Sequence, residues 1–277
     1  MNRIEAIFDR LRSRGDKALM PFITAGDPDL DTTGQLLPAM ERAGASICEL
    51  GIPFSDPIAD GPVIQASMTR ALERGVRPRR ILEMVDRHRA DLNMGLVAMV
   101  SYSIVYRLGG GSFYRDCRDA GFDGLIIPDL PLEEAREEAR KVRSTGLTCS
   151  FLIAPNTSPQ RAEEIAKICS GFVYVLSRAG LTGEQTVLAT DLPRRIKRLR
   201  NITDLPIAVG FGISSPRQVA QVTHIADAAI VGSAIVRRIA RVTANGEHSP
   251  RNVVAEVEPF VSELAGGLAT EKSAGTQ

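Results

Sequence analysis

The segment ALMPFITAGDPDLDTTGQLLPAMERAGASICELG, residues 18–51, contains the pattern that decides the fold. Its two ends, Ala18–Thr24 and Ser46–Gly51, are short and almost continuously apolar, which is typical of parallel strands covered by helices. Between them, Leu30–Ala43 has the amphipathic spacing of a helix, and Gly and Pro mark the turns. The segment therefore predicts a strand, a helix and a second, parallel strand.

The same alternation continues along the rest of the chain. Further strands are predicted at Gly95–Val100, Gly124–Ile127, Thr148–Ile153, Phe172–Leu176, Pro206–Val209 and Ala228–Val231. Further helices are predicted at Val63–Arg74, Arg80–Ala90, Leu132–Thr145, Pro159–Cys169, Pro216–Val222 and Ala234–Ala240. Eight strands in regular alternation with helices predict right-handed crossovers that close into a (β/α)8 barrel, or TIM barrel. The alternative is a doubly wound open sheet, which is weakened by the absence of a G-x-G-x-x-G motif after the first strand.

The length of the chain fits one domain of this kind. Its 277 residues would suggest two average domains, but (β/α)8 barrels commonly use about 250 residues for one. We predict a single barrel domain over residues 1–266 and a disordered tail over residues 267–277, which are small and polar. Apolar residues near the start share one helical face, so we expect an extra N-terminal helix docked on the barrel. These residues are Ile4, Ile7, Phe8 and Leu11.

Composition and charge exclude several classes of protein. The sequence is 44% hydrophobic and 24% charged, as in ordinary globular proteins and unlike disordered chains. Lys and Arg number 34 against 33 Asp and Glu, so no basic excess favours nucleic acid or an anionic membrane as partner. No apolar run approaches the roughly 20 residues of a membrane span and no signal peptide is evident, so we expect a cytoplasmic protein. The scattered cysteines and histidines argue against a metal site or a disulfide framework.

The loop after the second predicted strand carries three carboxylates in ELGIPFSDPIADG, residues 49–61. Residues that follow the strands of a (β/α)8 barrel gather at one face and form the active site. Glu49 lies inside an apolar run, and if it shares a face with Ile47 it points into the barrel, where burial suits it to general acid–base catalysis. A carboxylate satisfied by backbone or by an arginine is the alternative. Asp56 and Asp60 can also be turn residues beside Pro and Gly.

Glycine-rich loops follow the last three predicted strands, at residues 181–183, 210–214 and 232–235. They expose backbone N–H groups, and the last loop opens a helix whose N-terminal dipole favours an anion. Glycines at such turns often serve geometry alone, but phosphate sites recur after strands seven and eight of this fold. The loops together favour a phosphorylated substrate. Tyr174 in the sixth strand is either a core aromatic residue or a phenol that lines the pocket opposite Glu49.

Six stretches in this order and spacing resemble the signature of the tryptophan synthase α subunit family, and they span essentially the whole chain. The longest, ELGIPFSDPIADGPVIQ at Glu49–Gln65, is highly specific. The others are PFITAGDPD (Pro21–Asp29), PDLPLEEA (Pro128–Ala135), LSRAGLTG (Leu176–Gly183), GFGIS (Gly210–Ser214) and GSAIV (Gly232–Val236).

The resemblance implies a (β/α)8 barrel that cleaves indole-3-glycerol phosphate to indole and glyceraldehyde 3-phosphate without metal or organic cofactor. Glu49 matches the catalytic acid/base of the family, and Asp60 matches the carboxylate that engages the indole N–H. Asp56 resembles the residue through which the family senses its β subunit. Positions that match the indole pocket are Phe22, Met99, Ile126 and Tyr174, with Thr182 matching a lid residue that closes toward Asp60. Positions that match the phosphate site are Gly183, Gly212, Gly232 and Ser233.

One stretch departs from the family pattern. After the third strand relatives usually read Tyr-x-Asn, often followed by Pro, whereas this chain reads Ser101-Tyr102-Ser103-Ile104. If the alignment with the family pattern is shifted by one residue, Tyr102 substitutes for the missing tyrosine. Because this segment contributes to β-subunit docking in the family, the departure argues against that partnership, whereas Asp56 and Thr182 argue for it. Besides an α subunit of tryptophan synthase, two alternatives are a stand-alone lyase that releases indole and a non-catalytic regulatory partner.

Overall fold

The strands form one continuous parallel sheet that closes into a barrel. The computed structural model describes residues 1–57, 60–177, 190–210, 212–246 and 248–268. The strand order is β5-β4-β3-β2-β1-β9-β8-β7-β6, and each pair of neighbouring strands is parallel. The strands are β1 Ala18–Thr24, β2 Ile47–Gly51, β3 Gly95–Met99, β4 Gly124–Ile126, β5 Thr148–Ser150, β6 Leu152–Ile153, β7 Val173–Leu176, β8 Ile207–Gly210 and β9 Ala228–Val231.

The two ends of this order, β5 and β6, are separated only by Phe151. They are therefore two halves of one predicted strand, residues 148–153, which pairs with β4 through its first half and with β7 through its second. Counted in this way the barrel has the eight strands predicted from the sequence. The prediction of a (β/α)8 barrel is confirmed.

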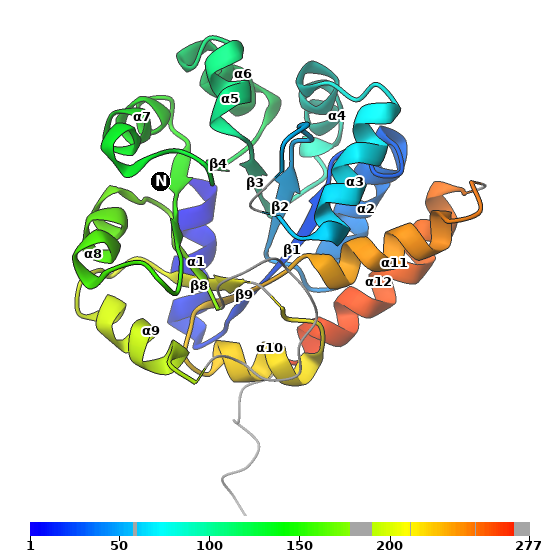
Figure 1. Cartoon of the computed structure of the whole chain (residues 1–277). Coiled ribbons are helices and arrows are strands. Elements are labelled where there is room, and N and C mark those ends of the chain that lie inside the picture. Colours follow the sequence, from blue (N-terminus) through cyan, green and yellow to red (C-terminus); the bar gives the residue numbers. More distant parts are fainter. Residues whose placement is uncertain (58–59, 178–189, 211, 247, 269–277) are drawn as a thin grey trace, which may run out of the picture.

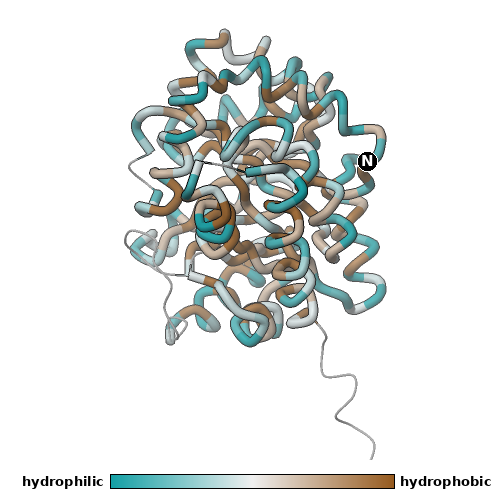
Figure 2. The backbone as a smooth tube through the Cα atoms, turned by 90° about the vertical axis from the view of Figure 1, so that its right-hand side faces the viewer, coloured by the Kyte–Doolittle hydropathy of each residue, from teal (hydrophilic) through white to brown (hydrophobic). Residues whose placement is uncertain are grey.

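Helices surround the strands in a ring, which Figure 1 shows from one end of the barrel. Figure 2 shows the hydrophobic segments concentrated toward the inside of the molecule and the hydrophilic ones toward its outside. No helix in the described part of the chain is both long and apolar enough to cross a membrane. The helices are α1 Arg3–Arg14, α2 Leu30–Arg42, α3 Pro62–Glu73, α4 Pro78–Arg89, α5 Tyr102–Arg107, α6 Gly111–Ala120, α7 Leu132–Ser144, α8 Pro159–Ile168, α9 Leu192–Arg200, α10 Pro216–Thr223, α11 Ser233–Thr243 and α12 Pro250–Gly266.

Successive side chains along each strand point alternately into two apolar layers, one inside the barrel and one between the strands and the helices. On β1, Met20 and Phe22 belong to the cluster inside the barrel, whereas Leu19 and Ile23 belong to the larger cluster between strands and helices. This division follows from the period of two along a strand, and burial on both faces explains why the strands read as continuous apolar runs. Glu49 on β2 stands in register with Phe22 and is therefore directed into the barrel.

The helix α1 closes the end of the barrel opposite the site. Its apolar face, Ile4, Ile7 and Phe8, is buried in the interior cluster, as the helical spacing predicted. Gly95 at the start of β3 makes room for it, since a side-chain carbon there would lie 2.5 Å from Cδ1 of Ile4. Asn2 caps the helix through a capping box. The carboxyl ends of the strands form the other end of the barrel, where active sites of this fold lie.

Candidate active site

Glu49 is an ionisable group placed alone among apolar side chains. It is fully buried, and neither of its carboxyl oxygens has a hydrogen-bond partner among the residues that the structure describes. Burial raises the pKa of Glu49 to about 8, and the nearby charge of Asp60 adds to the rise. An unpaired buried carboxyl is costly to the folded state, and such groups cluster at functional sites. The alternative of a carboxylate satisfied by backbone or an arginine is wrong.

Asp60 lies directly before α3, at the edge of the same space. Its backbone N–H donates to the carbonyl of Pro57 (3.0 Å), and the side-chain amide of Gln65 donates to the carbonyls of Pro57 (3.1 Å) and Asp60 (2.7 Å). The turn is therefore held by its own backbone and by Gln65, which leaves the carboxylate of Asp60 outside these contacts. Burial raises the pKa of Asp60 to about 6. The two carboxyl groups thus have different proton affinities.

Tyr174 on β7 faces the barrel interior near both carboxyl groups. It is almost fully buried, and burial together with the charges of Glu49 and Asp60 raises the pKa of its phenol well above the usual value. The phenol is therefore neutral at physiological pH and able to donate a hydrogen bond. Gly210 on the neighbouring strand provides the space for the ring.

Apolar side chains complete the walls of this space. Phe22 on β1, Met99 on β3 and Ile126 on β4 all belong to the interior cluster. The ring of Phe22 fits against β2 because Gly51 has no side chain there; an added carbon would lie 2.7 Å from its Cζ. Leu152 on β6 also packs against this cluster and pairs in register with Tyr174, although it was not among the predicted pocket residues. Leu152 shares a strand face with Ser150 and lies on the opposite face from Cys149, and this alternation would have indicated that Leu152 points into the barrel.

The predicted phosphate positions lie partly within the described structure. Ser233 is the first residue of α11, and Gly232 precedes it at the N-cap without any side chain that caps the helix. The first N–H groups of an eleven-residue helix are thereby left for a ligand at the carboxyl end of β9. Gly212 has a φ of 79°, a left-handed conformation that favours glycine. Thr182 and Gly183 lie outside the described residues.

The Ser101–Ile104 departure is organised around Asp129, which follows β4. The hydroxyl of Ser101 donates to one carboxylate oxygen of Asp129 (2.5 Å), and the N–H of Tyr102 donates to the other (2.8 Å). Ser101 is the N-cap of α5 and accepts from the N–H of Ser103, while Asp129 accepts from the first helical N–H and joins the loops that follow β3 and β4. The side chain of Tyr102 packs against the outer apolar layer, between the strands and the helices.

Asp56 is exposed at the same end of the barrel, where the hydroxyl of Ser55 donates to it (2.6 Å). This position is accessible to a partner, but no contact within the chain distinguishes it. No group of three potential metal ligands occurs among the described His, Cys, Asp and Glu residues. The two carboxyl groups can transfer protons, and the N–H groups at the start of α11 can bind an anion.

A parallel barrel with two interior carboxyl groups of unequal pKa, a neutral phenol and an uncapped helix end defines an acid–base enzyme acting on a small apolar and anionic substrate. The sequence matches the family model of the tryptophan synthase alpha chain over residues 8–267. The chain belongs to the tryptophan synthase alpha chain family.

Individual relatives agree with this assignment. The tryptophan synthase alpha chain of Microcystis aeruginosa is 43% identical over 265 residues, which cover 95% of this chain and 98% of that relative. That of Rhodopirellula baltica is 45% identical over 243 residues and 87% of each chain. Among solved structures, the tryptophan synthase subunit alpha of Legionella pneumophila superposes with a TM-score of 0.84 at 33% identity, covering 97% of this chain and 98% of that one. A chain of the aminoacrylate-bound tryptophan synthase of Mycobacterium tuberculosis gives a TM-score of 0.83 at 31% identity, covering 97% and 100%.

Proposed function

We propose that the chain is a lyase that cleaves indole-3-glycerol phosphate to indole and glyceraldehyde 3-phosphate, as the α subunit of tryptophan synthase. The observation that carries the proposal is the buried, unpaired carboxyl of Glu49, whose pKa is raised to about 8 while that of Asp60 is raised only to about 6. Near neutral pH this difference favours a protonated Glu49 beside an ionised Asp60.

The cleavage needs a proton at indole C3 and the loss of a proton from the adjacent side-chain hydroxyl. Glu49 in its protonated form donates to C3, while the carboxylate of Asp60 stabilises the positive charge that develops on the ring nitrogen. Glu49, now a carboxylate, accepts the hydroxyl proton. The O–H electron pair forms the aldehyde carbonyl, and the electrons of the broken C–C bond restore the aromatic ring. Glu49 ends in its starting form, and no proton is gained or lost.

Binding of the substrate divides between two parts of the site. The ring lies among Phe22, Met99, Ile126 and Tyr174, which supply an apolar and aromatic wall. The phosphate binds at the N-terminus of α11, through N–H groups at Gly232 and Ser233, with Gly212 in the loop after the neighbouring strand β8. We assign Gly183 to the same phosphate site and Thr182 to closure over Asp60.

The partner of the chain is a tryptophan synthase β subunit, and Asp56 is the residue through which the two communicate. The relatives are tryptophan synthase alpha chains, and the solved relatives include a chain of the aminoacrylate-bound tryptophan synthase of Mycobacterium tuberculosis. These likenesses do not favour a stand-alone lyase or a non-catalytic regulator. The four cysteines are free buried thiols, as in reducing compartments, which supports action in the cytoplasm.

Indole release from indole-3-glycerol phosphate by the purified chain, with and without a tryptophan synthase β subunit, tests the proposal. We expect slow turnover that rises strongly when the β subunit is added. Fast turnover indifferent to the β subunit would instead establish a stand-alone indole producer. Absence of turnover under both conditions would overturn the assigned reaction.

A further inference from the structure

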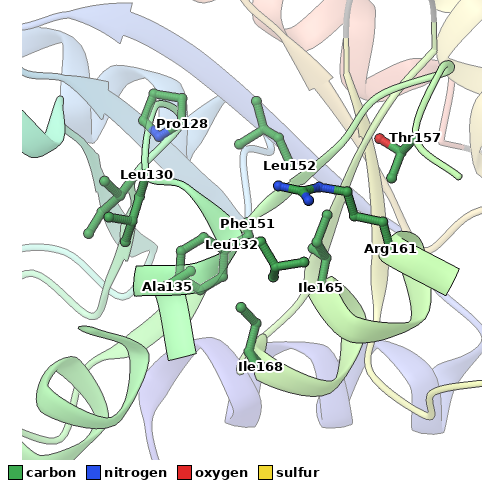
Figure 3. Close-up of a pocket in the computed structure, with 11 residues that line it drawn as sticks. Pro128, Leu130, Leu132, Ala135, Phe151, Leu152, Thr157, Arg161, Ile165 and Ile168 are labelled. Atoms are coloured by element: carbon green, nitrogen blue, oxygen red, sulfur yellow. The ribbon is translucent and has the colours of Figure 1, made fainter. Parts of the chain in front are cut away.

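The helices of the ring pack on the strands mainly through apolar side chains. Between α7 and α8, for example, Ala135, Ile165 and Ile168 belong to the outer apolar cluster (Figure 3). The charged side chain drawn there, Arg161, pairs with Glu133 (3.3 Å), and both are exposed, so this pair holds the helices weakly. The helix α3 differs, because two polar contacts tie it to the end of β1 and the loop that follows.

The first contact joins the last residue of β1 to the middle of α3. The hydroxyl oxygens of Thr24 and Ser67 lie 2.6 Å apart, and both side chains are buried. Because the Ser67 hydroxyl donates to the carbonyl of Ile64 (2.7 Å), it accepts from Thr24. A hydrogen bond is directional, so it fixes where α3 lies along β1 more closely than the apolar contacts of Ile64 and Met68 can.

The second contact lies one turn further along α3. The guanidinium of Arg70 donates from Nε to Oδ1 of Asp27 (2.9 Å) and from Nη2 to Oδ2 (2.7 Å). The side chain of Asp27 is only 1% exposed, and burial raises its pKa although Arg70 acts in the opposite direction. Removing Arg70 would therefore leave a buried carboxyl group without its cation. A two-point contact between planar groups fixes orientation as well as distance.

Asp27 is a fixed point because its loop is itself tied down. Its backbone N–H donates to the carbonyl of Thr24 (3.2 Å), and the N–H of Gly26 donates to the hydroxyl of Thr33 on α2 (2.9 Å). The carboxylate of Asp29 accepts from a backbone N–H in the first turn of α2 and caps that helix. The loop is thus held by β1 and α2, and α3 is the element that the two contacts position.

The position of α3 decides that of Asp60, which lies two residues before the helix begins at Pro62. Gln65 in the first part of the helix donates to the carbonyl of Asp60 (2.7 Å), so the turn that carries Asp60 moves with α3. Arg70 lies about 12 Å beyond Pro62 at 1.5 Å per residue. A change in the angle of α3 at Arg70 therefore displaces Asp60 relative to Glu49.

We propose that Arg70 and Asp27 are positioning residues for the acid–base reaction, because their buried pair sets the angle of α3 and thereby the place of the Asp60 carboxylate relative to Glu49. This inference rests on the proposed function, in which Asp60 acts on the substrate. Neither residue touches the substrate, and both act through α3.

The test follows the titration of the Asp60 carboxyl group by carbon-13 NMR, with the signal assigned through its loss in Asp60→Asn. In Arg70→Met, α3 is free to tilt and water reaches Asp60. We expect the titration midpoint of Asp60, about 6 in the parent, to fall by at least about half a pH unit. We expect kcat for indole-3-glycerol phosphate to fall at least about tenfold, because a small misplacement of a catalytic group is costly. Binding of glycerol 3-phosphate should stay within about threefold of the parent, because α11 carries the phosphate site.

Arg70→Lys keeps the charge but not the two-point contact, so we expect it to fall between the parent and Arg70→Met. Arg74→Met is the matched control. It removes a charge that also acts on Asp27, from the end of the same helix, and should change neither the midpoint nor kcat.

If Arg70→Met lowers only the melting temperature, or if Arg70→Lys behaves like the parent, the positioning role is refuted. Should Arg70→Met fail to fold, Ser67→Ala, which removes the other tie, takes its place, and an unchanged Asp60 midpoint there refutes the role equally. If the parent releases no indole while the midpoint still falls in Arg70→Met, the proposed function fails and the positioning of Asp60 by Arg70 stands.

Discussion

A side-chain carbon at Gly210 would lie 2.6 Å from the hydroxyl oxygen of Tyr174 and 2.7 Å from its Cε2. Neither distance is compatible with van der Waals contact, and the ring is too buried to move aside freely. The position of the phenol beside Glu49 therefore depends on the absence of a side chain on the neighbouring strand.

We expect Gly210→Ala to lower kcat/KM for indole-3-glycerol phosphate at least tenfold and to lower the melting temperature. The added methyl group displaces Tyr174 from its place near the two carboxyl groups. A double-mutant cycle with Tyr174→Phe checks the cause, because removing the hydroxyl relieves part of the clash. Strictly additive effects of the two changes would contradict this explanation.

The two carboxyl groups predict a bell-shaped pH dependence of kcat/KM. The active form has Asp60 ionised and Glu49 protonated, so activity rises as pH passes about 6 and falls as pH passes about 8. Asp60→Asn should lower kcat/KM severely, and the pH profile of the residual activity should lack the acidic limb. Comparing the two profiles on the same substrate cancels the titration of its phosphate. An unchanged acidic limb in Asp60→Asn would assign that limb to another group.

Glu49 also makes stability depend on pH. Its pKa is about 8 in the folded chain against 4.5 for an ordinary glutamate, so the folded state keeps a proton that the unfolded state has lost between these values. The free energy of unfolding contributed by this group therefore falls as pH rises from about 4.5 to about 8 and is constant above. We expect Glu49→Gln to abolish cleavage. We also expect the melting temperature of this variant, relative to that of the parent, to increase as pH rises from 5.5 to 8.5.

Thermal melts across this range check the sign of the effect. The exposed glutamate Glu83 supplies the control variant Glu83→Gln, whose melting temperature should follow that of the parent at every pH. Glycerol 3-phosphate should bind Glu49→Gln nearly as it binds the parent. If the difference in melting temperature shrinks as pH rises, Glu49 is not protonated in the folded chain at neutral pH.

Asp129 should act on the pocket through the two loops that it joins. Asp129→Ala removes both acceptors of Ser101 and Tyr102 and frees the segment after Met99. We expect KM to rise several-fold while kcat stays within about twofold, because the two carboxyl groups lie elsewhere. Asp129→Asn, which keeps one acceptor, should recover part of the loss. Asp119→Ala, at an exposed position of α6, is the control and should leave KM unchanged.

The phosphate assignment predicts a graded response at Gly232. A carbon added there lies 3.4 Å from Phe22, so Gly232→Ala fits with little adjustment, whereas the branched side chain of Gly232→Val covers the N-terminus of α11. Calorimetry with glycerol 3-phosphate should show at least tenfold weaker binding for valine and less than threefold for alanine. Gly266→Ala, in open surroundings, should bind as the parent does. Equal affinities for all three variants would place the phosphate elsewhere.

The sequence predicted the barrel because each strand alternates between two apolar layers and each connection has room for a helix. Ala18–Thr24 and Ala228–Val231 agree with the structure at both ends. The break at Phe151 was not predictable, because its cause is a change of pairing partner and residues 148–153 read as one apolar run. The helix α6 was missed because Gly109-Gly110-Gly111 reads as a flexible loop.

The site was predictable where a residue violated its local pattern. Glu49 stands out in an apolar strand, whereas the connection between Ser101 and Asp129 spans 28 positions and leaves no local signal. The proton affinities of Glu49 and Asp60 depend on burial that only the folded chain defines.

The fifth strand of the barrel differs from the others in that its two halves pair with different neighbours. Each half pairs on one side only, with three register pairs to β4 and two to β7. Because each half lacks a second strand partner, we expect amide hydrogen exchange to be fast in this part of the wall. Because Leu152 belongs to this strand, such breathing would briefly connect the interior of the barrel with the space between α7 and α8.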